Sequence, residues 1–313
     1  MLIPKAMLLE LTNHCNHRCI YCRFPKMTRP KINMSFDEIM IIIDKGKEIG
    51  IKSYYVAIMG EPTLHSHFID TLKYIKEKGC DFIFASNMEL LNEEKIDAIM
   101  KFITSTDKIQ CSMDSVNKEM FLKMRGEKSN FEKCINNTNY LINEFFKLKQ
   151  KPYLIISRVI TNINNIKEEE NDFHNNFMEG RRLKSTRNYY IAELKGKYTT
   201  DVSKVRTHLH IVDICNEYPT YHVSSNMAHW WYEGDKYDES TGLNLPCLRL
   251  TTDLAVLANG DVALCCVDYN GQHIMGNIFE DSIINIYNNE KFQYMRDNFP
   301  TGLCKECNCR WEI

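Results

Sequence analysis

Short apolar runs alternate with longer amphipathic segments through the first two thirds of the chain. Runs rich in β-branched and aromatic residues predict strands at 7–12, 54–59, 81–86, 108–114, 153–160 and 188–194. Apolar residues at helical spacing predict helices at 35–50, 67–79, 92–103, 130–149 and 165–180. Six β/α units with right-handed crossovers give a parallel sheet. The fold expected is therefore α/β, a partial (β/α)6 parallel barrel.

The segment after the first predicted strand, ELTNHCNHRCIYC, is polar and holds Cys15, Cys19 and Cys22. In parallel sheets, ligand sites lie at the carboxyl ends of strands, where this loop falls. Three closely spaced thiolates bind one metal ion, or three corners of an iron-sulfur cubane whose fourth iron stays open to a cofactor. Zinc is the alternative, with His14 or His17 as a further ligand, although neither forms a second ligand pair of the zinc-finger kind.

Composition narrows the class of protein. With 44% hydrophobic and 26% charged residues in 313, the chain is typical of a globular protein of one or two domains. Its net charge of -2 argues against a nucleic-acid partner, and it lacks a signal-like start or a long apolar segment. We expect a cytoplasmic protein with no membrane partner. In that compartment, 13 cysteines favour metal or redox chemistry over disulfides.

The C-x3-C-x2-C array with Tyr21 before its last cysteine resembles the motif of the radical S-adenosylmethionine enzymes. The second predicted strand ends in Met-Gly-Glu-Pro, which resembles the strand end that holds the methionine amino group in that family. The resemblance implies a [4Fe-4S] cluster on Cys15, Cys19 and Cys22. It also implies S-adenosyl-L-methionine cleaved to a 5'-deoxyadenosyl radical, with a flavodoxin or ferredoxin as electron donor.

The resemblance also implies which residues contact the cofactor. They are Tyr21, Gly60, Glu61, Pro62, Ser86, Asn87, Ser112, Asp114 and Arg158. Each has a plainer interpretation: Gly-Glu-Pro as a strand-ending turn, Ser86-Asn87 as a helix cap, and Arg158 as a surface ion pair. Their order at successive strand ends beside the cysteine loop favours the functional interpretation.

A second ligand set lies near the C-terminus. It consists of Cys247, Cys265, Cys304 and Cys307. Asn259-Gly260 predicts a hairpin turn between the first two, and a short helix is expected after Asp281. This order resembles the twitch module, a shortened SPASM-type domain, which implies a second [4Fe-4S] cluster. A four-cysteine zinc knuckle is the alternative.

Three domains are expected. They are a radical S-adenosylmethionine barrel at 1–196, a connecting segment at 197–245 that is a possible substrate mouth, and a small α+β cluster-binding domain at 246–313. The connecting segment contains AHWWYEGDKYDE, whose rings also suit packing between domains. Glu233 in that stretch and Cys266 in the last domain are candidate catalytic residues. Cys266 is a hydrogen-atom donor in one interpretation and a packed thiol in the other.

Four cysteine ligands leave no iron open on the second cluster, so electron transfer is its expected role. We therefore expect a radical S-adenosylmethionine oxidoreductase that oxidises a carbinol of a polar small molecule of sugar or aminocyclitol type. Epimerisation through Cys266 and modification of a ribosomal peptide are alternatives, so the substrate is a small molecule or a peptide. An iron-sulfur electron carrier or sensor is a different class, in which Gly-Glu-Pro would serve no purpose.

Overall fold

The structure is a computed structural model. It describes residues 1–160, 172, 176–177, 185–191, 209–215, 221–227, 247, 249–299 and 302–305. Of these, residues 160, 185–191, 209–215, 221–227, 302 and 305 are described by their backbone alone. The chain forms two compact units. Unit 1 comprises Met1–Cys15, Arg23–Phe84 and Lys236–Ile313, and unit 2 comprises Asn16–Cys22 and Ala85–Asp235.

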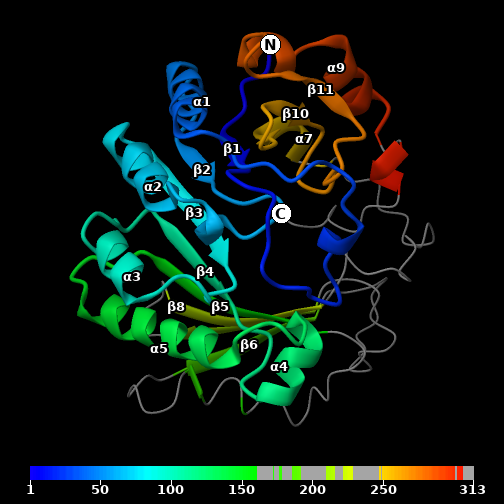
Figure 1. Cartoon of the computed structure of the whole chain (residues 1–313). Coiled ribbons are helices and arrows are strands. Elements are labelled where there is room, and N and C mark those ends of the chain that lie inside the picture. The colour runs from blue at the N-terminus through cyan, green and yellow to red at the C-terminus, as the bar shows by residue number, and fades with distance from the viewer. Residues whose placement is uncertain are drawn as a thin grey trace. The chain divides into compact units, whose positions relative to one another are not determined.

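Unit 1 contains a mixed sheet in the order β11-β10-β9-β1-β2-β3. Its strands are β1 (Ala6–Leu9), β2 (Ser53–Tyr55), β3 (Asp81–Ser86), β9 (Asp253–Val256), β10 (Asp261–Ala263) and β11 (Ile274–Asn277). β1 pairs in parallel with β2 and with β9, whereas β10 runs antiparallel to both β9 and β11 (Figure 1). Strands from the two ends of the chain therefore form one continuous sheet.

The helices of unit 1 bury apolar stripes. They are α1 (Phe36–Glu48), α2 (Phe68–Glu77), α7 (Arg249–Thr252), α8 (Ile283–Tyr287) and α9 (Glu290–Asp297), with 3-10 turns η1 (Phe24–Lys26), η2 (Pro62–Leu64) and η5 (Gly302–Lys305). α1 begins at a capping box, in which Ser35 and Glu38 bond each other's backbone N–H, close to the predicted start of this helix. α1 and α2 pack side by side, and Ile39, Ile42 and Ile43 of α1 are buried.

Unit 2 contains the strand order β4-β5-β8-β7-β6. Its strands are β4 (Lys108–Ser112), β5 (Tyr153–Ile160), β6 (Ser185–Ile191), β7 (Leu209–Cys215) and β8 (Tyr221–Met227). β4, β5 and β8 are parallel, while β7 runs antiparallel to β8 and to β6. The helices are α3 (Glu93–Met100), α4 (Lys118–Arg125) and α5 (Phe131–Lys147), and α5 packs on both others. Asparagine side chains cap all three, as Asn130 does for α5.

The predicted fold class is confirmed by parallel β/α units and a small strand-rich module at the C-terminal end. The expectation that 188–194 supplies the sixth parallel strand is wrong. β6 runs antiparallel to β7, and the parallel neighbour of β5 is β8, from the presumed connecting segment. Apolar runs identify a strand but not its partner. The helix expected at 165–180 lies almost wholly outside the described residues.

Two local features differ from expectation. α4 was not predicted, because an eight-residue helix offers little periodicity to detect. The short helix α7 follows Cys247, so the first strand of the hairpin, β9, begins only at Asp253; the hairpin at Asn259-Gly260 and the helix after Asp281 are confirmed. Among the described residues, no helix combines the length and apolar character that crossing a membrane requires.

Candidate functional site

A buried carboxylate at the end of β1 organises the site in unit 1. Glu10 is 0% exposed and forms a two-point ion pair with Arg29 at 2.8 and 2.9 Å. The same carboxylate accepts the backbone N–H groups of Met59 at 3.2 Å and Ala258 at 3.0 Å. It thereby joins the carboxyl end of β1 to the segments that follow β2 and β9. Glu10 was not among the predicted site residues, because its only signal in the sequence is an acid within the apolar run MLLELT.

The Gly-Glu-Pro strand end packs against the backbone that leads into the first cysteine. Gly60 has φ +83°, and a Cβ there would lie 2.6 Å from the carbonyl oxygen of His14 and 2.7 Å from that of Thr12. The next amide, Glu61 N–H, donates to the His14 carbonyl at 2.7 Å. The Glu61 carboxylate caps η2 by accepting the N–H and hydroxyl of Thr63. Only glycine allows this close backbone approach.

In unit 2, the end of α4 holds the loop Asn16–Cys22, which carries Cys19 and Cys22. The N–H groups of Arg18 and Ile20 donate to the carbonyls of Arg125 and Met124, both at 2.9 Å. Helix C-termini leave such carbonyls without intrahelical donors, so the loop satisfies them. A Cβ on Gly126, whose φ is +95°, would lie 3.1 Å from the Cβ of Arg18. The unpredicted helix α4 is therefore part of the site.

Two of the expected cofactor residues are joined in a buried network. The Asp114 carboxylate accepts the Tyr21 hydroxyl at 2.7 Å, the Arg125 Nε–H, and the Val159 N–H at 2.8 Å. Burial lowers the pKa of Arg125, but the Asp114 carboxylate raises it by more. The net pKa of Arg125 therefore lies well above its usual value. Arg125 Nη2 is buried and has no hydrogen-bond partner among the described residues. Arg125 was not predicted as a site residue, although the Arg125-Gly126 pair signals the end of a helix.

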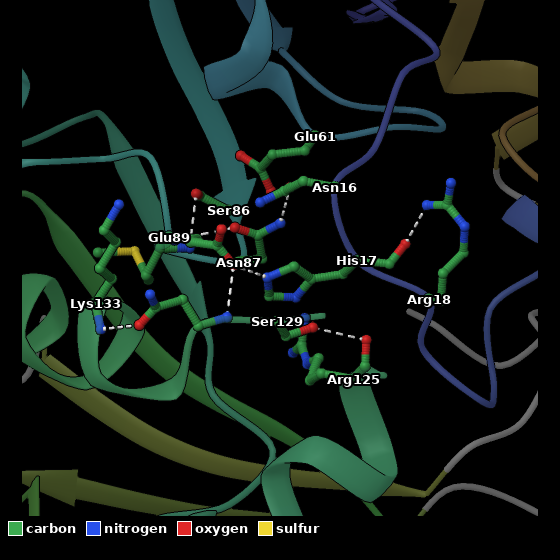
Figure 2. Close-up of polar contacts among 12 residues, drawn as sticks. Asn16, His17, Arg18, Glu61, Ser86, Asn87, Glu89, Arg125, Ser129 and Lys133 are labelled. Atoms are coloured by element: carbon green, nitrogen blue, oxygen red, sulfur yellow. Dashed lines mark hydrogen bonds and ion pairs between the residues drawn. The ribbon is translucent and has the colours of Figure 1, made fainter. Parts of the chain in front are cut away.

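Two side-chain contacts connect the same loop to the end of β3 (Figure 2). Asn87 Nδ2 donates to Asn16 Oδ1, and His17 Nε2 lies against Glu89 Oε2, both at 2.8 Å. Burial lowers the pKa of His17 to about 4, with help from the Arg125 charge. Burial raises the pKa of Glu89, but the Asn130 N–H and His17 outweigh it, so the net pKa is lowered. Neither His17–Glu89 nor Asn16–Asn87 was expected as a pair.

The other predicted residues of the first site lie at strand ends. Ser86 is buried and its hydroxyl accepts the Met88 N–H at 3.0 Å, whereas the helix that follows, α3, is capped by Asn92 and not by Ser86 or Asn87. Ser112 ends β4 and is partly exposed. Arg158 is only 1% exposed on β5, which excludes the surface ion pair considered for it.

The second cysteine set lies in unit 1. Cys247 and Cys265 are partly exposed, and Cys304 is buried in η5. Cys265 belongs to the loop 264–273, which folds around the buried Asp268: its carboxylate accepts the N–H groups of Gln272 and His273, both at 2.8 Å. Cys266 is buried. Cys307, Cys309 and Glu233 lie outside the described residues.

The sequence matches two known families. Residues 9–171, more than half of the chain, match the Radical SAM superfamily, and 247–308 match SPASM, an iron-sulfur cluster-binding domain. The chain is 32% identical over 80 residues to an S-adenosyl-L-methionine-dependent 2-deoxy-scyllo-inosamine dehydrogenase of Niallia circulans, covering 24% of this chain and 32% of that protein. Two further curated relatives are matched over 31% and 37% of their own lengths, so this chain spans about a third of the length of each.

Solved structures share the fold over nearly the whole chain. BtrN in complex with AdoMet and 2-DOIA superimposes with a TM-score of 0.55 and 15% identity, covering 97% of this chain and 93% of BtrN. Streptococcus suis SuiB bound to the precursor peptide SuiA gives a TM-score of 0.64 and 15% identity, covering 98% and 70%. At such low identity, the likeness shows the fold and leaves the substrate undetermined.

Proposed function

The chain belongs to the radical SAM superfamily, and from that premise we propose that it oxidises a carbinol of a polar small molecule of sugar or aminocyclitol type. The second cysteine module carries the proposal. An auxiliary cluster with four cysteine ligands has no open iron for substrate, so electron uptake is the role that its ligand set suits. Cys265, Cys304 and Cys247 belong to that set, with Cys307 as the fourth member.

The residues present fit the two [4Fe-4S] clusters and S-adenosylmethionine that the family uses. Cys15, Cys19 and Cys22 are partly exposed, so they are open to a cluster. Gly60 leaves room where any side chain would collide with the backbone leading into Cys15. The first cluster and S-adenosylmethionine supply one-electron chemistry that ends in abstraction of a substrate hydrogen, and the second cluster supplies an electron acceptor.

We assign Arg125 to the carboxylate of S-adenosylmethionine. Its Nη2 donor is buried without a partner among the described residues, while its Nε is bonded to Asp114. Guanidinium groups bind carboxylates through paired N–H donors. Asp114 then acts by orienting Arg125 and Tyr21, in addition to the cofactor contact expected for it. Ser86, Asn87, Ser112 and Arg158 remain proposed cofactor contacts.

The burial of Cys266 favours oxidation over epimerisation. A thiol that returns hydrogen to a substrate radical must reach the substrate, and the Cys266 residue is only 7% exposed. Glu233 stays a proposed catalytic residue, since an acid in the segment expected to line the substrate mouth would suit proton transfer.

Peptide modification is the second candidate. SuiB, solved with a precursor peptide, shares the fold over 98% of this chain. BtrN, solved with 2-DOIA, is matched over 93% of its own length, against 70% for SuiB. This chain therefore matches a larger share of BtrN than of SuiB, and this difference in coverage supports the small-molecule proposal.

The proposal is tested with the anaerobic holoenzyme, a chemical reductant and a panel of probes: 2-deoxy-scyllo-inosamine, simple sugars, and unmodified peptides. Oxidation gives a product lighter by two hydrogens, with no solvent deuterium retained at the new ketone carbon. In deuterium oxide, a product heavier by one mass unit at an inverted carbon, lost in Cys266→Ala, would overturn oxidation in favour of epimerisation.

The auxiliary module has its own test. A double Cys304→Ala, Cys307→Ala variant should still form 5'-deoxyadenosine slowly while losing oxidised product. Full turnover in that variant would assign the module a structural role instead.

A further inference from the structure

Two polar pairs fix the segment between the first two cysteines, and neither belongs to the cysteine motif. We propose that His17 and Glu89, supported by Asn16 and Asn87, form a clamp that positions the cysteine loop to receive the first cluster. The proposal concerns positioning residues, and it holds whatever the substrate of the enzyme is.

The geometry gives the clamp two points of attachment on consecutive loop residues. Asn16 Oδ1 accepts from Asn87 Nδ2 at 2.8 Å, and His17 Nε2 meets Glu89 Oε2 at 2.8 Å (Figure 2). His17 is 2% exposed, and its ring packs edge-on against Phe121 of α4. Two adjacent side chains held by separate partners remove most of the loop's freedom to rotate about its own backbone.

Glu89 is itself held in place. The N–H of Asn130, at the start of α5, donates to Glu89 Oε2 at 2.9 Å. A carboxylate at the N-terminus of a helix interacts favourably with the helix dipole. The clamp therefore transmits the position of α5 to His17.

The backbone between Asn87 and Glu89 is strained in a way that serves the clamp. Met88 has φ +68°, the only positive value for a residue other than glycine among the described residues. Asn137 Nδ2 holds the Met88 carbonyl at 2.7 Å, and the Ser86 hydroxyl accepts its N–H. Strain of this kind persists only where surrounding contacts enforce it. The turn lets Asn87 and Glu89 both contact the loop.

A metal ion is the other occupant that these side chains suggest. Ligand atoms of His17, Glu89 and Cys134 all lie within 4.8 Å of one another. However, N and O ligands of one tetrahedral ion, each about 2.05 Å from the metal, are about 3.4 Å apart. The separation of 2.8 Å between His17 and Glu89 is that of a hydrogen bond. The geometry therefore favours the clamp.

The test compares His17→Leu with His17→Gln, since glutamine restores a side-chain N–H at a similar reach and leucine does not. His67→Leu is the matched control, because it removes an exposed histidine–aspartate pair in unit 1. Hydrogen exchange of the cluster-free protein should be about ten- to a hundredfold faster in loop 16–22 for His17→Leu, the loss expected for one charge-assisted bond. Exchange in β5 and α5 should be unchanged, and His17→Gln should restore much of the protection.

The reduced holoenzyme gives a second readout that needs no substrate. S-adenosylmethionine should alter the electron paramagnetic resonance spectrum of the first cluster in the parent and in His17→Gln, and less completely in His17→Leu. Parent-like loop exchange in His17→Leu would overturn the clamp, as would an equal rise throughout unit 2. Stoichiometric zinc lost alike in His17→Leu and Cys134→Ser would replace it with a metal site.

Discussion

The two cysteine-bearing loops are held in opposite ways. Loop 16–22 depends on groups far along the chain: carbonyls of α4, the Asp114 carboxylate, and the clamp of His17 and Glu89. Loop 264–273 is folded largely by its own Asp268, with Arg29 Nε donating to the Tyr269 carbonyl from outside. The first loop should therefore respond to changes in several distant elements, and the second to changes in its own Asp268 and in the neighbouring segment of Thr28 and Arg29, which donates to it.

The largest expected effect comes from the first motif. Replacing Cys15, Cys19 and Cys22 by alanine should reduce the iron content from about eight to about four per chain, as for two cubanes reduced to one. Formation of 5'-deoxyadenosine should cease. Iron analysis and chromatography of the nucleoside check both statements. Stoichiometric zinc with no iron in the reconstituted parent would contradict the whole cluster assignment.

Breaking the Glu10–Arg29 pair should have the next largest effect. Arg29→Met leaves a buried carboxylate without its cation, which costs about 3–5 kcal/mol. It also frees the Tyr269 carbonyl, so loop 264–273 should lose auxiliary iron more readily than loop 16–22 loses its cluster. Denaturant unfolding and iron analysis measure the two effects. An exposed control, Lys123→Ala, should leave both unchanged.

Asp268 tests how self-contained the second loop is. Asp268→Ala leaves two amides without an acceptor, at about 1–3 kcal/mol each if both remain buried, whereas Asp268→Asn keeps one acceptor oxygen. Auxiliary iron should fall in the order parent, Asn, Ala, with formation of 5'-deoxyadenosine retained. Equal loss from both clusters would mean that the two loops are not held independently.

The smallest effect should come from Tyr21→Phe. It removes one hydrogen bond to Asp114, which keeps Arg125 and the Val159 amide, so the expected cost is about 1 kcal/mol. The midpoint of denaturant unfolding of the cluster-free protein measures it. A cost as large as that of Arg29→Met would show that the Asp114 network depends on the hydroxyl.

The sequence predicted local requirements better than distant pairings. Gly60 was identifiable because the Gly-Glu-Pro tripeptide alone indicates that the strand end requires a glycine. Tyr21 and Asp114 were each singled out, yet their bond was not, since they are 93 positions apart. Arg125, Glu10 and the His17–Glu89 pair were missed for the same reason: periodicity reports which face of an element is buried and not what that face meets.

The strand β8 shows a second limit. Its sequence, YHVSSNM, is polar and lacks the apolar run of a buried parallel strand, so it was placed in a connecting segment. The short module at the C-terminus was easier, because Asn259-Gly260 marks its hairpin and four cysteines mark its chemistry. Where β9 would pair could not be deduced, because the hairpin signal specifies only the partner within the hairpin.

The pairing of β9 with β1 limits how this enzyme can be rearranged. The family boundary at residue 247 suggests a detachable part, but β9 is bonded along all of β1 and Ala258 supplies one of the donors to Glu10. A chain cut at 246 would leave β1 as an unpaired edge of the sheet and would expose the Glu10–Arg29 ion pair to water. Exchanging C-terminal modules between such enzymes therefore replaces the strand that pairs with β1. A grafted module needs a β1 whose sequence matches the new β9.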